Sequence, residues 1–314
     1  NIGDLMFPIL SGNVASATAV SGNSEGIFAF GYNSTSLVYF AVSNLVSDVG
    51  VVGSDVAAVG TARRQAGACE YGEDKGIMAY SNKGAIVSMS NLVSNAGVVA
   101  SDVAGVGTAR NISSGAASYG TDKGIFAYGT SSGGYVSMSN LVTNLGVIGS
   151  DVTGVGTARD GSGACEYGDD KAIFAYGYIS ATPPYVSMSN LVSNVGVIGD
   201  DVAGVGTARY ATSACRYGGD KGIFAYGGVV GGNTAVSNLV SNVGVIGSDV
   251  AAVGATRHNQ AATQYGKDKG IFAFGDISAA ITLPSNLVSN TGVVASDVTA
   301  VGSKRGYPGA CSFN

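Results

Sequence analysis

The charged residues that could do chemistry in this chain are few, and most recur at fixed intervals. An arginine ends each of six similar segments, and an aspartate stands eight residues before it. A ring of such arginines could bind an anionic ligand, whereas carboxylate–guanidinium pairs that recur with the repeat can simply hold it together. Because a binding site usually breaks the symmetry of a repeat, we interpret them as structural pairs. The pairs are Asp55 with Arg63, Asp102 with Arg110, Asp151 with Arg159, Asp201 with Arg209, Asp249 with Arg257, and Asp297 with Arg305.

Groups suited to catalysis are scarce. His258 is the only histidine, which excludes multi-histidine metal sites and leaves at most one histidine base. It stands in a variable segment directly after Arg257, where we expect an exposed loop residue. Glu70 and Glu166 occupy equivalent positions in two repeats, so we interpret them as a repeated structural choice. No phosphate-binding, dinucleotide-binding or calcium-binding loop motif is present. The sequence therefore predicts a protein that is not an enzyme and that needs no cofactor and no metal.

A unit of 47 to 50 residues, repeated six times, positions these groups. Each unit holds four short strand-like runs separated by turn signals, for example GACEYG, GIFAYG, YVSMSNLVS and VGVIGSDVAGVG. None of these runs has the length and periodicity of a helix. Four-stranded units of this size, repeated six times, are typical of a β-propeller, and an open β-solenoid is the alternative. We predict an all-β fold, a six-bladed β-propeller of four-stranded antiparallel blades.

The two ends of the chain compete for one place in this fold. Residues 16–20 and residues 306–314 both resemble the innermost strand, but a ring of six blades has room for six such strands. We expect the C-terminal copy to close the ring by pairing in the first blade, so that residues 16–314 form the propeller. The N-terminal segment, residues 1–15, is apolar and is expected to contact another part of an assembly. The alternative is that the N-terminal copy forms the inner strand.

Four cysteines fall in the first run of four different units: Cys69, Cys165, Cys215 and Cys311. Inner strands of adjacent blades should lie roughly 8–10 Å apart, which exceeds the ~7 Å limit for Cα atoms joined by a disulfide. We therefore predict four free, buried thiols that act as small hydrophobic groups.

Composition limits the classes of partner. The chain has 314 residues, a formal net charge of −5 and only 12% charged residues, which argues against binding of nucleic acid. No apolar run approaches the eighteen or so residues of a membrane span, so no membrane insertion is expected. A surface that is low in charge and rich in Ser, Asn and Gly favours a virion or extracellular location.

The stretch GTAR followed by ACEYGDDKAIFAYG resembles the Kelch repeat, in which an arginine precedes the first strand and glycine ends the second. The chain departs from that family because only Gly227 and Gly228 form the paired glycine and tryptophan is absent. The pattern SNLVSNxGVV, DVxGVGTAR and YGxDKGIFAYG is more similar to propeller repeats in predicted structural or tail-fibre proteins of bacteriophages, especially marine ones. That resemblance implies a structural role in a virion or at a surface.

Length variation points to one face of the predicted fold. The connections after IFAYG and after each arginine vary, and alternating strand direction puts both on the same face. The other face carries the Asp-Lys turns, which we expect to be solvated. Tyrosines on the variable face match the composition of recognition loops, although such loops also vary where nothing constrains them. The candidate recognition residues are Tyr32, Tyr135, Tyr178, Tyr185 and Tyr210.

The sequence thus predicts a non-enzymatic structural or adhesive component of a virion or extracellular assembly. Its expected partners are other subunits of the same or a larger assembly and a cell-surface glycan or receptor. The alternative is a carbohydrate-binding, lectin-like propeller that uses the tyrosine-bearing face.

Overall fold

The computed structural model describes residues 22–57, 59–277, 280–281, 284–299 and 301–314. These residues form strands, turns and irregular segments but no helix, so the predicted all-β class is confirmed for them. Accordingly, the described part of the chain has no helix long and apolar enough to cross a membrane. The predicted N-terminal segment (1–15) and the competing strand (16–20) lie outside the described residues.

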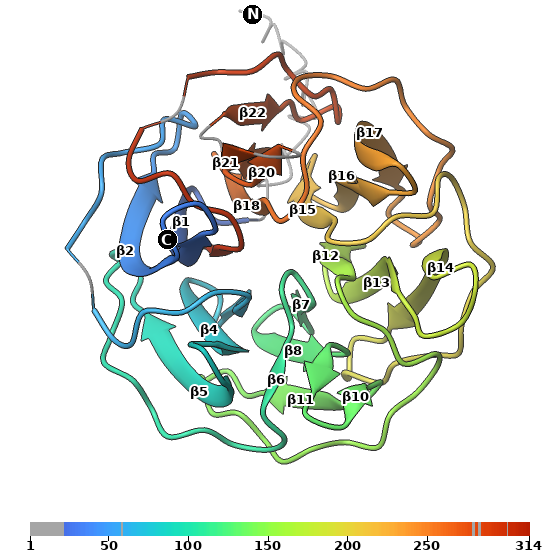
Figure 1. The fold of residues 1–314 in the computed structure, drawn as a ribbon, viewed down its shortest axis with the longest axis horizontal. Helices are drawn as coiled ribbons and strands as arrows, with labels where there is room; N and C mark the ends of the chain where they lie inside the picture. The colour runs from blue at the N-terminus through green and yellow to red at the C-terminus, as the bar shows by residue number, and fades with distance from the viewer. Residues whose placement is uncertain (1–21, 58, 278–279, 282–283, 300) are drawn as a thin grey trace, which may run out of the picture.

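Six three-stranded antiparallel sheets follow the six repeats, each with an inner, a middle and an outer strand (Figure 1). The inner strands are β3 (Gly67–Tyr71), β7 (Ala116–Tyr119), β12 (Gly163–Tyr167), β15 (Ser213–Tyr217), β18 (Ala261–Tyr265) and β23 (Gly309–Phe313). The middle strands are β1 (Glu25–Asn33), β4 (Lys75–Asn82), β8 (Lys123–Ala127), β13 (Lys171–Tyr178), β16 (Lys221–Val229) and β19 (Lys269–Ala273). The outer strands are β2 (Val38–Val46), β5 (Ile86–Val93), β11 (Ser139–Val142), β14 (Tyr185–Val192), β17 (Gly232–Val240) and β22 (Ser285–Val288). Two smaller sheets are formed by β6 (Arg110–Asn111), β9 (Thr130–Ser131) and β10 (Gly134–Tyr135), and by β20 (Asp276–Ile277) and β21 (Ala280–Ile281).

The sheets are arranged around a common axis, with the inner strands nearest to it (Figure 1). Inner strands pack against each other in series, β3 against β7, then β12, β15, β18 and β23, and β23 in turn packs against β3. The apolar core lies between neighbouring sheets. In one such cluster Tyr80 of one sheet meets Phe126 of the next edge to face, with ring centroids 5.4 Å apart. Each sheet is therefore covered on both faces, which explains apolar runs without strict alternation.

The first sheet is built from both ends of the described chain. Strand β23 pairs with β1 from Glu25 opposite Phe313 to Ala29 opposite Gly309. The predicted pairing of the C-terminal strand with the first repeat is thus confirmed. This pairing also covers the inner edge of β1, which would otherwise present unpaired backbone groups.

The prediction of a fourth strand in each unit is wrong. The run that follows β2 meets that strand only at isolated bridges beside Val52 and Val56. Between these bridges the buried side chain of Asn44 donates from Nδ2 to the carbonyl oxygen of Gly53 at 2.9 Å. A side-chain amide thus takes an acceptor that a fourth strand would use, and an equivalent asparagine does the same in every repeat. The run lies along the sheet without a continuous ladder.

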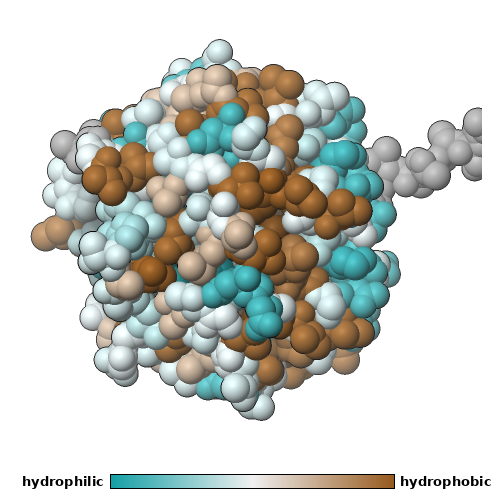
Figure 2. All heavy atoms as spheres, turned by 90° about the vertical axis from the view of Figure 1, so that its right-hand side faces the viewer, coloured by the Kyte–Doolittle hydropathy of each residue, from teal (hydrophilic) through white to brown (hydrophobic). Residues whose placement is uncertain are grey.

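These outer runs leave valines in solvent. One valine at the same position of every repeat is 59–64% exposed, and Figure 2 shows apolar side chains gathered between polar ones on one side of the molecule. We call these residues the valine band: Val51, Val98, Val147, Val197, Val245 and Val293.

Candidate functional site

The six repeated arginines are fully buried at the joints between neighbouring sheets. The guanidinium carbon of Arg209 lies 4.0 Å from the ring centroid of Tyr176 in the preceding sheet. Its Nη2 donates to Asn238 Oδ1 of the following sheet at 2.6 Å, and its Nη1 lies 3.9 Å from Asp249 Oδ1. We call this unit of arginine, ring, asparagine and aspartate the arginine clamp. It connects each sheet to the next.

The structure corrects the partners that sequence spacing predicted for the arginines. In five of the six clamps the aspartate contacts the arginine of the preceding repeat, not the arginine eight residues after it. Five such ion pairs measure 3.6–3.9 Å: Arg63–Asp102, Arg159–Asp201, Arg209–Asp249, Arg257–Asp297 and Arg305–Asp55. In the sixth clamp Arg110 donates to Asn140 Oδ1 at 2.7 Å, while Asp151 accepts from Thr108. The eight residues between an aspartate and its own arginine cross to the next sheet, which separates the pair.

The segment GTAR is a docking motif for the following repeat. The backbone N and Oγ1 of Thr207 donate to the carboxylate of Asp249, the latter at 2.6 Å. A Cβ on Gly206 would lie 2.3 Å from Asp249 Oδ1, and the residue has a φ of +74°, so glycine is required there. Burial alone would raise the pKa of Asp249, but hydrogen bonds from Thr207 and Asn238 outweigh it and hold that pKa below its usual value.

A bulge in the middle strand supplies the aromatic ring of each clamp. The aromatic residue that follows IFA, or IMA in the second repeat, has a φ between 50° and 65° in all six sheets, as at Tyr176, and the pairing register shifts there in β13. Such a conformation is uncommon for a residue with a side chain, and a bulge redirects the side chain that it carries. The ring is thereby turned beneath the arginine. The IFAYG segment and its unusual backbone conformation therefore serve to place the aromatic ring of the arginine clamp.

Four of the five candidate tyrosines are brought together on the face with the variable connections. The ring centroids of Tyr135 and Tyr178 are 5.8 Å apart, and those of Tyr178 and Tyr185 are 5.5 Å apart. Tyr185 and Tyr210 stack at 5.2 Å with an interplanar angle of 6°. These four residues are the tyrosine cluster. Tyr32 contacts other partners, including Tyr39 at 4.7 Å.

His258 extends the tyrosine cluster, and the expectation that it is an exposed loop residue is wrong. Its backbone pairs with Asp276, and its half-buried ring lies 5.9 Å from that of Tyr210. Burial lowers the pKa of His258, an effect that the Asp276 carboxylate opposes, and burial raises the pKa of Asp276. His258 Nδ1 and Asp276 Oδ1 have no hydrogen-bond partner among the described residues. The same holds for Nε of five clamp arginines, so an unpaired buried atom of this kind does not by itself mark a binding site.

The turns on the opposite face join neighbouring sheets. Lys171 Nζ lies 2.6 Å from Asp170 Oδ1, and Asn194 donates to the other oxygen of Asp170 at 3.0 Å. The backbone N of Gly168 donates to the carbonyl oxygen of Asp220 in the next turn at 2.8 Å. These Asp-Lys turns are partly exposed, and each lysine is compensated by its own neighbour.

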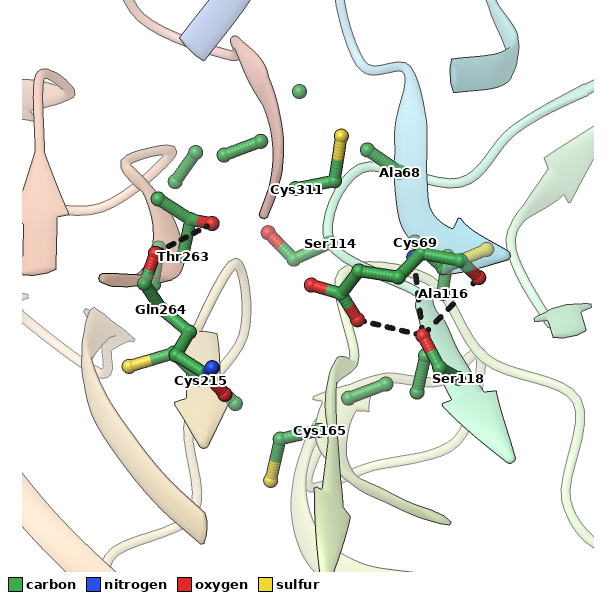
Figure 3. A pocket seen from close by; sticks show the side chains of 18 of the residues that line it. Ala68, Cys69, Ser114, Ala116, Ser118, Cys165, Cys215, Thr263, Gln264 and Cys311 are labelled. Atoms are coloured by element: carbon green, nitrogen blue, oxygen red, sulfur yellow. Dashed lines mark hydrogen bonds between the residues drawn. The ribbon is translucent and has the colours of Figure 1, made fainter. Parts of the chain in front are cut away.

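The inner strands enclose a narrow axial channel of about 60 Å³, shown in Figure 3 with the cysteines around it. The four cysteines are free and buried, as predicted, and burial raises the pKa of their thiols, that of Cys215 to about 12. A Cβ on Gly222 of the next middle strand would lie 2.4 Å from Cys165 Sγ, so each thiol fills a space left by a glycine. Where the inner residue is Ala117, the next middle strand has Ala172 in place of glycine.

At the end with the Asp-Lys turns, the channel widens to a cavity of about 590 Å³. One residue from each inner strand, the one before its last aromatic residue, lies at this end. Around the axis these six residues, which we call the axial ring, are Ser312, Glu70, Ser118, Glu166, Arg216 and Gln264.

The axial ring contains two carboxylates with different partners. Ser118 Oγ donates to Glu70 Oε2 at 2.6 Å, one of the bonds drawn in Figure 3, and the backbone N of Ser312 donates to Oε1 at 3.0 Å. Glu166 accepts from Arg216 at 2.9 Å. Burial and then the nearby Glu70 carboxylate raise the pKa of Glu166 to about 7, and Arg216 opposes both effects.

The sequence predicts a structural role for Glu70 and Glu166, and it contains no motif that marks the other members of the axial ring. A signal for these residues is present in the sequence at one position of the inner strand, directly before its tyrosine or phenylalanine. There the residue changes chemical type from repeat to repeat while its neighbours are nearly constant.

No protein-family model matches the chain, and no curated protein matches it. The resemblance to Kelch repeats and to bacteriophage repeat proteins therefore stays a prediction. Within the described residues, no group of three or more His, Cys, Asp or Glu side chains is arranged to hold a metal ion.

Proposed function

We propose that the chain is a six-bladed β-propeller that serves as a non-enzymatic structural or adhesive component of a virion or other extracellular assembly. The series of packed inner strands and the pairing of β1 with β23 support the propeller. Its role in an assembly is supported by the resemblance to fibre proteins of bacteriophages and by the valine band. In four repeats a second apolar residue two positions earlier is also exposed (Val49, Leu145, Val195 and Val243), and apolar side chains exposed together favour contacts with other subunits.

The tyrosine cluster is the observation that carries the adhesive role. Its rings come from three consecutive repeats, lie on the face with the variable connections, and are only half-buried. Tyrosine supplies a large contact area with a polar end at little conformational cost, which suits a surface that recognises a cell-surface partner. The mutual packing of the four rings holds this surface in place without a ligand.

Binding to intact bacterial cells tests this role. The double variant Tyr178→Ala with Tyr210→Ala removes the centre of the tyrosine cluster, and we expect at least about tenfold weaker binding of the fluorescently labelled chain. Tyr32→Ala removes a tyrosine of the first sheet that lies outside the cluster, so it is the matched control and should bind normally. Equal binding by both variants, with equal thermal stability, would contradict the adhesive role of the cluster.

A carbohydrate ligand is the second candidate. The half-buried rings of Tyr178, Tyr185 and Tyr210 favour a ligand that has both apolar faces and hydroxyl groups, because each ring offers an apolar face and a polar end. A glycan array probed with the wild-type chain decides this. Absence of binding at millimolar sugar concentration would exclude the lectin and leave a protein receptor.

A further inference from the structure

Glu70 is a carboxylate without a counter-ion at the wall of a large cavity. No ion pair joins it to any described residue, whereas the neighbouring Arg216 binds Glu166 at 2.9 Å and Asp169 at 2.8 Å. Glu70 lines the cavity of about 590 Å³ at the end of the axial channel. A partly buried charge that is hydrogen-bonded but not neutralised favours the binding of a cation from solution.

Hydrogen bonds hold this carboxylate in a fixed position. Oε2 accepts from Ser118 Oγ at 2.6 Å, and Oε1 accepts from the backbone N of Ser312 at 3.0 Å and from Ser312 Oγ. The donors come from the two inner strands that flank β3, so neither oxygen depends on a flexible loop. A ligand therefore meets a prearranged anionic group, and little free energy is lost in ordering it.

The rest of the cavity wall carries both signs of charge, with an excess of acidic residues. Its acidic residues outnumber its basic ones, Arg216 and Lys267, and Arg216 is already engaged by two carboxylates. The acidic residues are Glu70, Glu73, Asp74, Glu166 and Asp169. Asp74 is paired with Lys75, and Glu166 and Asp169 share Arg216, so the excess of negative charge comes mainly from Glu70 and Glu73. Because acidic groups surround a concave space, they raise the local concentration of cations.

The form of the site favours an organic cation over a metal ion. A volume near 590 Å³ is in the range of small-molecule sites and far exceeds that of a single ion. Glu70 accepts three hydrogen bonds, two on Oε1 and one on Oε2, so its carboxylate offers a single further position, whereas a metal ion requires several ligands. An ammonium or guanidinium group can instead donate one hydrogen bond to that position and use its other donors for neighbouring acceptors.

We propose that the cavity at the turn-bearing end of the axial channel binds a small organic cation, with its ammonium or guanidinium group against Glu70. Gln264 and Ser312 of the axial ring also line the cavity and can form hydrogen bonds with the remainder of the ligand. This site lies at the opposite end of the channel from the tyrosine cluster and does not depend on the adhesive role.

Isothermal titration with 1,4-diaminobutane at low ionic strength tests the site, with the neutral 1,4-butanediol as the matched ligand. The diamine is expected to bind and the diol is not. Glu70→Gln keeps the shape of the side chain and removes its charge, and it should weaken diamine binding at least about tenfold. Asp200→Asn makes the same change of charge at an exposed position outside the cavity and should change binding less than about twofold.

A second variant keeps the test decisive if Glu70→Gln unfolds the chain. Lys267→Ala removes a positive charge from the rim of the cavity and should strengthen diamine binding about two- to threefold. Equal binding of diol and diamine, or equal effects of Glu70→Gln and Asp200→Asn, would overturn the proposal, as would no effect of Lys267→Ala. The tyrosine variants should bind diamine normally, which separates this site from the adhesive face.

Discussion

The arginine clamp and the axial ring are built by the same six repeats, yet the clamp is nearly invariant, whereas the residue in the axial ring changes from each repeat to the next. Arginine and asparagine are the same in all six clamps, whereas the axial ring has serine, glutamate, arginine and glutamine. The difference follows from what surrounds the six copies of each feature. Clamps are separated from one another by whole sheets, so each copy has the same surroundings.

Members of the axial ring, in contrast, are neighbours of each other. Six copies of one charged residue around the axis would place like charges together in a partly buried space, which is unfavourable. The ring instead alternates donors and acceptors, as where Ser118 stands between Glu70 and Glu166. Repetition stabilises the joints, and only the axis and the variable face are free to become specific sites.

Removing a clamp arginine should have the largest effect. Arg209→Met leaves Asn238 and Asp249 without their buried partner and removes the cation over Tyr176, so the free energy of unfolding should fall by about 3–5 kcal/mol. Urea denaturation at neutral pH measures this. A loss below about 1 kcal/mol would show that the clamp does not hold the sheets together.

Arg159→Met is the internal comparison for that variant. Arg159 Nη2 and Asn190 Oδ1 have no hydrogen-bond partner among the described residues, so this clamp has one charged hydrogen bond fewer. We expect a loss about 1–2 kcal/mol smaller than for Arg209→Met.

The packing of thiols against glycines should respond next. Gly222→Ala places a methyl group 2.4 Å from Cys165 Sγ and should cost about 2 kcal/mol of stability. The double variant Cys165→Ala with Gly222→Ala recreates the natural pair Ala117–Ala172, and it should recover most of that loss. Denaturation of the single and double variants gives the coupling energy, and strictly additive effects would contradict the packing relation.

The axial ring should make stability depend on pH. Because the pKa of Glu166 is raised to about 7 in the folded chain, the folded state holds a proton more tightly than the unfolded state does. The contribution of the Glu166 carboxyl group to the free energy of unfolding is therefore present at low pH and is lost as the pH rises to about 7. The groups that act on it are Glu70, Arg216 and, through Arg216, Asp169.

Glu166→Gln cannot titrate, so its stability relative to the wild type should increase by about 1–2 kcal/mol between pH 5 and pH 8. Denaturation of both proteins across this range measures the difference, in which the other titrating groups largely cancel. A constant difference would show that Glu166 is ionised throughout. Ser118→Ala should not abolish the pH dependence, because burial is the largest cause of the raised pKa of Glu166.

The smallest effect on the free energy of unfolding is expected at the one link that lacks a hydroxyl side chain. Ala255 stands where the other links have threonine or serine, and only its backbone N donates to Asp297, at 2.9 Å. Ala255→Thr should add the missing hydroxyl bond and stabilise the chain by about 0.5–1 kcal/mol, since the aspartate is partly exposed. Thr207→Ala should give a loss of similar size, and opposite signs for the two variants are the required result.

The sequence by itself determined the features that depend on residues near each other in the chain. The number of repeats, the positions of the inner, middle and outer strands, the Asp-Lys turns and the burial of Cys165 and its equivalents follow from local patterns of glycine, apolar residues and turn signals. The C-terminal strand could also be assigned, because it is a copy of a recognisable segment.

Only the tertiary structure decided which repeat meets which. The spacing in the sequence pairs Asp249 with Arg257, but the packing of successive sheets pairs Asp249 with Arg209. In the folded chain the side chain of Asn44 also takes a backbone acceptor, the carbonyl oxygen of Gly53, that a fourth strand would use. The same packing brings Tyr135 to Tyr178 and Glu70 to Ser118. Such contacts depend on how whole sheets stack around an axis. Residues close in sequence do not determine that stacking, because each repeat has the same local preferences whatever its neighbour is.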